Sequence, residues 1–222
     1  QIVKAYGAVM DEELPERLAH FLSKDESSCV GPLLQYSMQR LWEKAREKSR
    51  EHPTLSWDLF QDMNRSGMWR GFIEQQLSEL PLKYNDSGLL LNLLGECLPE
   101  DNTSKIVLAS YIKEKYVIEE ALKEDLFQQF LNIRLLCTPA LDNLQLRRTL
   151  RLSHQLLERP LLHLLHQSQR PGQEIPRLLQ HHLKRASYLN KMELALVQRY
   201  RDTIPKLNIK EEQLLKESVG VV

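Results

Sequence analysis

The stretch Leu131–Leu162, LNIRLLCTPALDNLQLRRTLRLSHQLLERPLL, decides the fold. It begins as the end of an amphipathic helix and passes through residues 139–143, PALDN, a cluster of turn residues. Residues 144–152 then alternate between apolar and polar side chains, which predicts a half-buried strand of a hairpin. Ser153 is the predicted N-cap of the next helix, because its hydroxyl oxygen can accept from the free N–H groups of the first turn. Helix, hairpin and helix in this order predict the distal half of a winged-helix domain.

The rest of the chain is rich in leucine at spacings of three and four, so we expect a mainly α fold in three parts. We expect residues 1–83 to form a helical bundle and residues 84–166 to form the winged-helix domain with its short β-hairpin. We expect residues 167–222 to form a C-terminal helical linker. The helices expected in the bundle are Asp11–Phe21, a long helix opened by Gly31-Pro32, Trp57–Met63 and Met68–Leu80. Those expected in the winged helix before its hairpin are Leu89–Leu98, Lys105–Lys115 and Ile118–Ile133. Those expected in the linker are Ile175–His182, Lys184–Tyr200 and Lys210–Val219.

The long helix of the bundle has a clear start and a clear buried side. Pro32 fits its first turn, because the N–H that proline lacks would be unpaired there anyway. Charged residues between Glu43 and Arg50 predict a solvated face. The residues expected to be buried are Leu34, Met38, Leu41, Trp42 and Ala45.

Composition limits the classes of function. The formal net charge of the 222 residues is zero, so no overall attraction to nucleic acid or an anionic membrane is expected. Cys29, Cys97 and Cys137 have neither disulfide-framework nor metal-knuckle spacing, which favours a reducing, cytoplasmic setting. No apolar run approaches the roughly eighteen residues that a membrane span needs. The chain starts at Gln1 without a signal-peptide pattern, and we expect it to be an internal part of a longer protein.

The residues around the hairpin also carry a family resemblance. The segment from Ile133-Arg-Leu-Leu136 through the hairpin to Leu152-Ser-His-Gln155 and Pro160-Leu-Leu162 resembles the winged helix of STAND-type nucleotide switches, especially a bacterial branch of STAND NTPases. In the related NB-ARC proteins a Met-His-Asp motif occupies this junction. The triplet here is Ser153-His154-Gln155, so only the histidine matches. The resemblance implies that His154 contacts the β-phosphate of bound ADP. The alternative is that His154 only caps the hairpin locally.

Two further segments resemble the same family. Val30-Gly-Pro-Leu-Leu-Gln-Tyr36 with Leu41-Trp42 is similar to an LPLLQYAL..LW signature of the helical domain. The resemblance implies that Gly31 and Pro32 belong to a GxP-like motif whose proline lies against the adenine; otherwise Gly31-Pro32 simply starts a helix. Residues 188–218 more weakly resemble the helical linker that precedes C-terminal sensor repeats in these proteins.

The resemblance implies a regulatory role rather than an enzyme in this chain. No GxxxxGK[ST] sequence occurs, so the loop that cradles phosphates is missing and this chain alone is not expected to hydrolyse ATP. In the intact protein the resemblance implies ATPase activity, ATP or ADP with Mg²⁺ as cofactor and a P-loop domain upstream of Gln1. It also implies C-terminal sensor repeats and homo-oligomerisation on activation. No nucleotide is expected in this chain by itself.

Two other functions compete with this interpretation. A winged-helix transcriptional regulator would use Arg147, Arg148 and Arg151 with nearby lysines as DNA phosphate contacts, next to a helical partner-binding domain. Carboxylates at Glu119 and Glu120 would repel the phosphate backbone, so nucleic acid binding is not the favoured hypothesis. His163 and His166 share a helix face, but no cysteine or carboxylate spacing completes a metal site.

Overall fold

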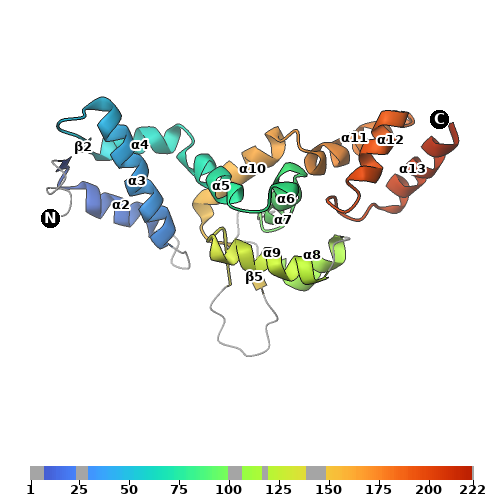
Figure 1. The fold of residues 1–222 in the computed structure, drawn as a ribbon, viewed down its shortest axis with the longest axis horizontal. Coiled ribbons are helices and arrows are strands. Elements are labelled where there is room, and N and C mark those ends of the chain that lie inside the picture. The colour runs from blue at the N-terminus through green and yellow to red at the C-terminus, as the bar shows by residue number, and fades with distance from the viewer. Residues whose placement is uncertain (1–7, 24–29, 100–106, 117–119, 139–148, 222) are drawn as a thin grey trace.

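A computed structural model of the chain describes residues 8–23, 30–99, 107–116, 120–138 and 149–221 (Figure 1). The N-terminal elements are β1 (Val9–Met10), α2 (Leu14–Leu22), α3 (Val30–Lys48), β2 (Thr54–Leu55), α4 (Trp57–Arg65) and α5 (Met68–Ser78). The central elements are α6 (Leu82–Asp86), α7 (Leu89–Gly95), β3 (Val107–Leu108), α8 (Ala109–Lys115), α9 (Glu120–Asn132), β4 (Leu136–Cys137), β5 (Thr149–Leu152), the 3₁₀ helix η1 (Gln155–Leu157) and α10 (Glu158–Gln167). The C-terminal elements are α11 (Pro171–Arg185), α12 (Lys191–Arg199) and α13 (Ile209–Val221).

The predicted fold class, mainly α with a helical bundle, a winged helix and a C-terminal helical part, is confirmed. Figure 1 shows an elongated molecule with α2, α3 and α4 at one end, α11, α12 and α13 at the other, and the winged helix between them. Within the described ranges, no helix has both the length and the apolar character needed to cross a membrane.

The helices of the bundle begin at residues that favour a helix start. Pro32 lies in the first turn of α3, as predicted. The hydroxyl of Ser56 accepts from the N–H of Leu59 at 3.3 Å and caps α4. Gly67 precedes α5 with a φ of 92°, a left-handed conformation that glycine adopts without steric cost. The short parallel pair of β1 and β2 closes this end of the bundle.

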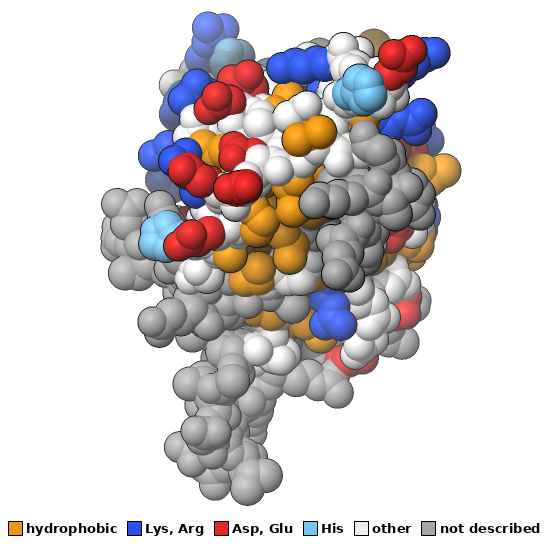
Figure 2. Space-filling view, turned by 90° about the vertical axis from the view of Figure 1, so that its left-hand side faces the viewer, with side chains coloured by type: hydrophobic (Ala, Val, Ile, Leu, Met, Phe, Trp, Pro, Cys, Tyr) orange, Lys and Arg blue, Asp and Glu red, His pale blue; other side chains and the backbone are white. Residues whose placement is uncertain are grey.

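The buried face of α3 differs from the prediction. Leu34 is 40% exposed and Trp42 is only partly buried, with the guanidinium of Arg46 over its ring. The ring of Tyr36 packs edge-on against Phe72 of α5, and this contact turns the neighbouring face of α3 inward. The buried residues of α3 are Leu33, Tyr36, Ser37, Leu41 and Ala45. Figure 2, which views the N-terminal end of the molecule, shows apolar side chains open to the surface in the middle of that end, with charged side chains beside and above them.

The central part has the strand order of a winged helix. β5 lies between β3 and β4 and is antiparallel to both. The helix predicted from Lys105 begins only at Ala109, because Val107 and Leu108 form β3. Thr149–Leu152 is buried throughout rather than half-buried, since β5 is the middle strand of the sheet. The predicted turn at residues 139–143 and the first half of its strand lie outside the described residues.

The C-terminal helices also differ in extent from those predicted. α11 begins at Pro171, before the predicted start at Ile175, and extends to Arg185, with Pro176 inside the helix. The helix predicted over Lys184–Tyr200 is interrupted, because Ala186 adopts a left-handed conformation with a φ of 50°. α12 then starts at a capping box in which Asn190 and Glu193 pair each other's backbone N–H groups.

Two hydrophobic cores divide the chain differently from the three predicted parts. One continuous cluster of buried side chains runs from Leu14 to Leu164, so the bundle and the winged helix share a core. A second cluster lies wholly within α11–α13 and the turns that join them; its fully buried members include Ile175, Leu179 and Val197. The shared core gives no support to the predicted boundary between the bundle and the winged helix at residues 83 and 84, which stays a prediction. Residues 175–214, in contrast, have a core of their own.

A buried amide pair joins the C-terminal helices to the winged helix. Because Pro176 has no N–H, the carbonyl of Gly172 lacks its usual helical donor. The amide nitrogen of Asn92 on α7 donates to that carbonyl and to the carbonyl of Thr203, each at 3.1 Å. The amide nitrogen of Gln173 in turn donates to the amide oxygen of Asn92 at 2.8 Å.

A second junction lies at the end of α8. The N–H of Lys206 donates to the carbonyl of Lys115 at 2.7 Å, beside a bridge between Tyr116 and Pro205. The phenol of Tyr116 donates to Glu96 at 3.0 Å, and the ammonium group of Lys115 pairs with the same carboxylate at 2.8 Å. Burial, together with the nearby carboxylate, raises the pKa of Tyr116 well above its usual range, so this donor stays protonated. The C-terminal helices are thus fixed to the winged helix at two places.

We expect Trp69→Ala to lower the free energy of unfolding by about 3–5 kcal/mol, as truncations of buried aromatic residues do. Trp69 is buried and its indole N–H donates to Asn64 at 2.6 Å. Trp42→Ala is the matched control and should cost less than half as much, because Trp42 is only partly buried. Chemical denaturation of both variants checks this, and equal losses would contradict the packing described for α3 and α5.

A second prediction concerns the amide junction. Asn92→Ala leaves the carbonyls of Gly172 and Thr203 without their side-chain donor, which we expect to cost about 1–3 kcal/mol for each buried group left unpaired. Hydrogen exchange should rise at the start of α11 and in the turn after α12. Asn132→Ala removes an exposed asparagine of α9 and should change neither quantity. Unchanged exchange in Asn92→Ala would show that the amide does not hold this junction.

Candidate functional site

His154, predicted to sense phosphate, lies at the junction of β5 and η1 and has no exposed surface. Its ring bonds to two parts of the chain that are far apart in sequence. Nδ1 accepts from the N–H of Leu156 at 3.1 Å, and Nε2 lies 2.9 Å from the carbonyl oxygen of Leu22. Leu22 is the last residue of α2, so this bond joins the bundle to the winged helix across 132 positions of sequence.

The two contacts determine where the proton of the ring is held. Nδ1 faces an N–H group and must be the unprotonated acceptor, while Nε2 faces a carbonyl and must carry the hydrogen. This tautomer is assigned from the two partners. A neutral His154 therefore has no hydrogen-bonding capacity left over. Both ring nitrogens are satisfied inside the protein.

The predicted cap at Ser153 is wrong, because His154 takes that role. His154 has an extended backbone, with φ −161° and ψ 140°, and its ring nitrogen caps the first turn of η1. Ser153 is buried, and its own N–H donates to the carbonyl of Leu135 at 3.0 Å. Ser153 thus continues the pairing of β5 with the segment that leads into β4, and the helix start moves on by one residue.

Gly31 and Pro32 lie at the start of α3. Gly31 is exposed, and a Cβ atom built on it would meet nothing within 4 Å. Pro32 is partly buried and fits a helix start whether or not a ligand binds there. Residues 24–29, which connect the end of α2 to these two residues, lie outside the described ranges.

In the arrangement seen, His154 has no donor available for a phosphate, while the roles expected of Gly31 and Pro32 stay predictions. The single N–H of His154 is already donated to Leu22, and the ring is fully buried. Gly31 has free space around it and shows no close approach that would require glycine. A phosphate contact at His154 would require the end of α2 to move away first.

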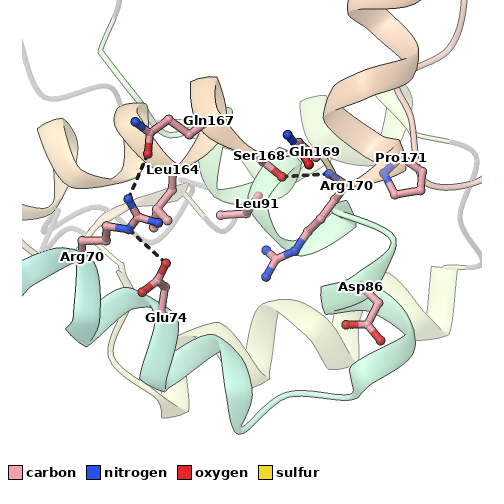
Figure 3. A pocket seen from close by; sticks show the side chains of 10 residues that line it. All are labelled: Arg70, Glu74, Asp86, Leu91, Leu164, Gln167, Ser168, Gln169, Arg170 and Pro171. Atoms are coloured by element: carbon pink, nitrogen blue, oxygen red, sulfur yellow. Dashed lines mark hydrogen bonds and ion pairs between the residues drawn. The ribbon is translucent and has the colours of Figure 1, made fainter.

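A cavity of about 430 Å³ lies between α5, α7 and the α10–α11 turn (Figure 3). The guanidinium of Arg70 is held by Glu74 and Gln167 at 3.0 and 2.9 Å. The side chain of Arg170 points into the cavity between Leu91 and Asp86. Sequence reasoning missed this site because its residues come from four separate elements. Its walls carry two arginines and two carboxylates, so its charges balance and favour neither an anion nor a cation.

The candidate DNA contacts are only partly described. Arg151 is buried in β5, and Lys115 is paired with Glu96, so neither is placed to meet a phosphate backbone. Arg147, Arg148 and Glu119 lie outside the described residues, and nothing is described of the side chain of Glu120. Among the residues that the structure describes, no three histidine, cysteine or acidic side chains are grouped as metal ligands.

Comparison with known proteins identified no matching family model, no similar curated protein and no similar solved structure.

We expect His154→Ala to destabilise the protein by about 1–3 kcal/mol, chiefly because the buried carbonyl of Leu22 loses its donor; the N–H of Leu156, which is partly buried, also loses its acceptor. His163→Ala on α10 is the matched control, because His163 is exposed, and it should stay within about 0.5 kcal/mol of the parent. Chemical denaturation measures both. A small effect of His154→Ala would mean that its two hydrogen bonds contribute little.

Proposed function

We propose that this chain is the helical and winged-helix regulatory part of a STAND-type signal-transduction ATPase. The observation that carries the proposal is the hydrogen bond between His154 of the winged helix and Leu22 at the end of α2. It lies at the position where the family resemblance expects a sensing histidine. The segment that follows Leu22 leads into Gly31 and Pro32. The hydrogen bond between His154 and Leu22 therefore depends on the relative position of the bundle and the winged helix, the two parts that such a switch must hold together.

The chemistry of imidazole supports a switching role for this residue. The neutral ring has one donor, which can serve Leu22 or another acceptor but not both. A hydrogen bond to a charged acceptor such as phosphate contributes about 1.5–3 kcal/mol, against about 0.5–1.5 kcal/mol for a neutral one. Each 1.4 kcal/mol changes a two-state ratio about tenfold, so exchanging one partner for the other is enough to change which state dominates.

In the intact switch, bound ADP or ATP with Mg²⁺ would supply the charge that the closed state recognises. This chain contributes none of the phosphate-loop residues. Its own residues would close over the nucleotide and set the balance between a closed monomer and an open, assembling form. A P-loop domain, sensor repeats and homo-oligomerisation on activation are the partners and behaviour that the proposal includes.

The proposal predicts that this chain alone binds ATP or ADP no better than about millimolar and has no ATPase activity. The reason is that a phosphate loop normally supplies most contacts to the phosphates. Isothermal titration calorimetry of the 222-residue chain measures the affinity. Micromolar binding would contradict the proposal that a separate P-loop domain supplies most of the phosphate contacts.

The sharper test uses the protein at its natural length. His154→Ala should release ADP faster and assemble without a trigger, because the closed state loses its sensing contact. His163→Ala controls for loss of a histidine from the same region. Retained nucleotide and size-exclusion chromatography read the two effects. Unchanged ADP retention with a persistent monomer would reject the proposed function even if His154 is important for stability.

A further inference from the structure

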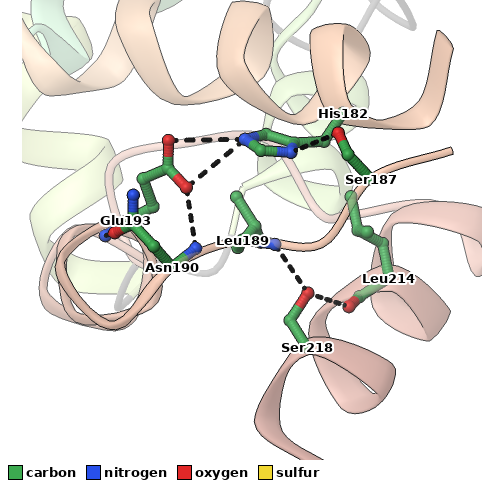
Figure 4. Close-up of polar contacts among 7 residues, drawn as sticks. All are labelled: His182, Ser187, Leu189, Asn190, Glu193, Leu214 and Ser218. Carbon is green, nitrogen blue, oxygen red and sulfur yellow. Dashed lines mark hydrogen bonds and ion pairs between the residues drawn. The ribbon is translucent and has the colours of Figure 1, made fainter. Parts of the chain in front are cut away.

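A hydrogen-bonded chain of serine, histidine and glutamate lies at the joint between α11 and α12 (Figure 4). The hydroxyl of Ser187 is 2.9 Å from Nδ1 of His182. The carboxylate of Glu193 lies 3.3 Å from Nε2 of the same ring, through either oxygen. In the neutral ring, Nε2–H donates to Glu193 and Nδ1 accepts from the hydroxyl of Ser187. The order of the groups is that of a nucleophile, a general base and an orienting acid, with the two ring nitrogens exchanged relative to the Ser-His-Asp triad.

Local structure fixes each of the three side chains. His182 lies in the last turn of α11. The left-handed Ala186 reverses the chain, so that the N–H of Ser187 donates to the carbonyl of His182 at 3.2 Å. Glu193 is held by the capping box of α12, where one of its oxygens accepts from the N–H of Asn190 at 2.8 Å. The three groups are therefore preorganised rather than brought together by chance rotamers.

A cavity of about 310 Å³ opens beside the nucleophile and the base. Its walls include Ser187 and His182, whereas Glu193, which lies on the opposite side of the imidazole from Ser187, is not among the lining residues. A substrate entering this cavity would therefore meet the hydroxyl and the general base but not the acid. The other lining residues include Leu183, Tyr188, Leu214 and two of opposite charge, Lys210 and Glu217.

Two donors that belong to residues lining the cavity are the candidate partners for an oxyanion formed at Ser187. The N–H of Tyr188, the residue after the serine, has no hydrogen-bond partner among the described residues. The ammonium group of Lys210 belongs to a residue that lines the same cavity. Donors directed at the oxygen of a tetrahedral intermediate are usually the largest single contribution to acyl-transfer catalysis.

We propose that Ser187 is an activated nucleophile that cleaves small carboxylic esters, an activity independent of the nucleotide switch proposed above. The Oγ of Ser187 attacks the ester carbonyl carbon while its proton moves to Nδ1 of His182. Collapse of the tetrahedral intermediate breaks the ester C–O bond, and His182 gives the proton to the departing alcohol. Water then attacks the acyl-serine, with His182 as base, and releases the acid. Glu193 is a positioning residue that orients the ring.

The test is covalent labelling of the whole 222-residue chain with a fluorophosphonate probe. Phosphonylation joins Oγ to phosphorus and expels fluoride, and mass spectrometry locates the modified residue. We expect selective labelling of Ser187 and slow hydrolysis of p-nitrophenyl acetate. Ser187→Ala should abolish the labelling at this site, and His182→Gln should slow it at least about hundredfold, as loss of a general base does. Glu193→Gln keeps the capping box and should slow labelling at least about tenfold.

Ser78→Ala is the matched control, because Ser78 is an exposed serine whose hydroxyl donates to the carbonyl of Gln75 rather than to a histidine. It should label at the parent rate. Circular dichroism identifies any variant that fails to fold, and Glu193→Gln is the variant least disturbing to α12. Absence of labelling in the folded parent chain would overturn the proposal. So would labelling spread over several serines, or labelling of Ser187 that is unchanged in His182→Gln and Glu193→Gln, since a purely structural relay predicts those results.

Discussion

The carbonyl groups of Leu22 and Gly172 are left unpaired by their own helices, and each is satisfied by a side chain from the winged helix. Leu22 is the last residue of α2, and Gly172 faces a proline four residues later. His154 donates to the first carbonyl and Asn92 to the second. A buried acceptor without a donor costs more than a typical hydrogen bond contributes, so both contacts constrain the fold strongly. Side chains of the winged helix thus hold both the N-terminal bundle and the C-terminal helices in place through hydrogen bonds.

The hydrogen bonds at Leu22 and at Gly172 differ in how much apolar packing surrounds them. The contact at Leu22 accompanies a continuous apolar core that joins the bundle to the winged helix. At the other end, α11–α13 have a core of their own, and the amide network and the contacts of Lys206 and Tyr116 carry much of the attachment. Gly172 allows a close approach there, because an added Cβ would lie 2.8 Å from the carbonyl oxygen of Ser87. The C-terminal helices are accordingly attached to the winged helix by specific polar contacts.

Sequence patterns predicted the helices well where apolar spacing and caps agree, as at Pro32 and over Met68–Ser78. They failed where a tertiary contact decides between two local choices. The ring of Tyr36 sets which face of α3 is buried, and β3 is too short to show an alternating pattern. The break at Ala186 carries no glycine to mark it. Among the candidate site residues, the burial of His154 could not be foreseen, because its partner Leu22 is distant in sequence. The relay at His182 was missed because the predicted helix Lys184–Tyr200 ran through Ser187, where the chain turns instead.

The shared core limits how the switch proposed for this chain would open. Separating the bundle from the winged helix would expose apolar surface at about 25 cal/mol for each Å², so a few hundred Å² would outweigh any single hydrogen bond. α5 packs against α10 and η1 and contributes fully buried residues to this core. A smaller movement, in which the end of α2 withdraws from His154 while α5 stays in place, exposes far less apolar area. In the switch proposed above, exchange of one hydrogen bond of His154 for a charged acceptor, worth about 1.5–3 kcal/mol, would act on a rearrangement of this smaller kind.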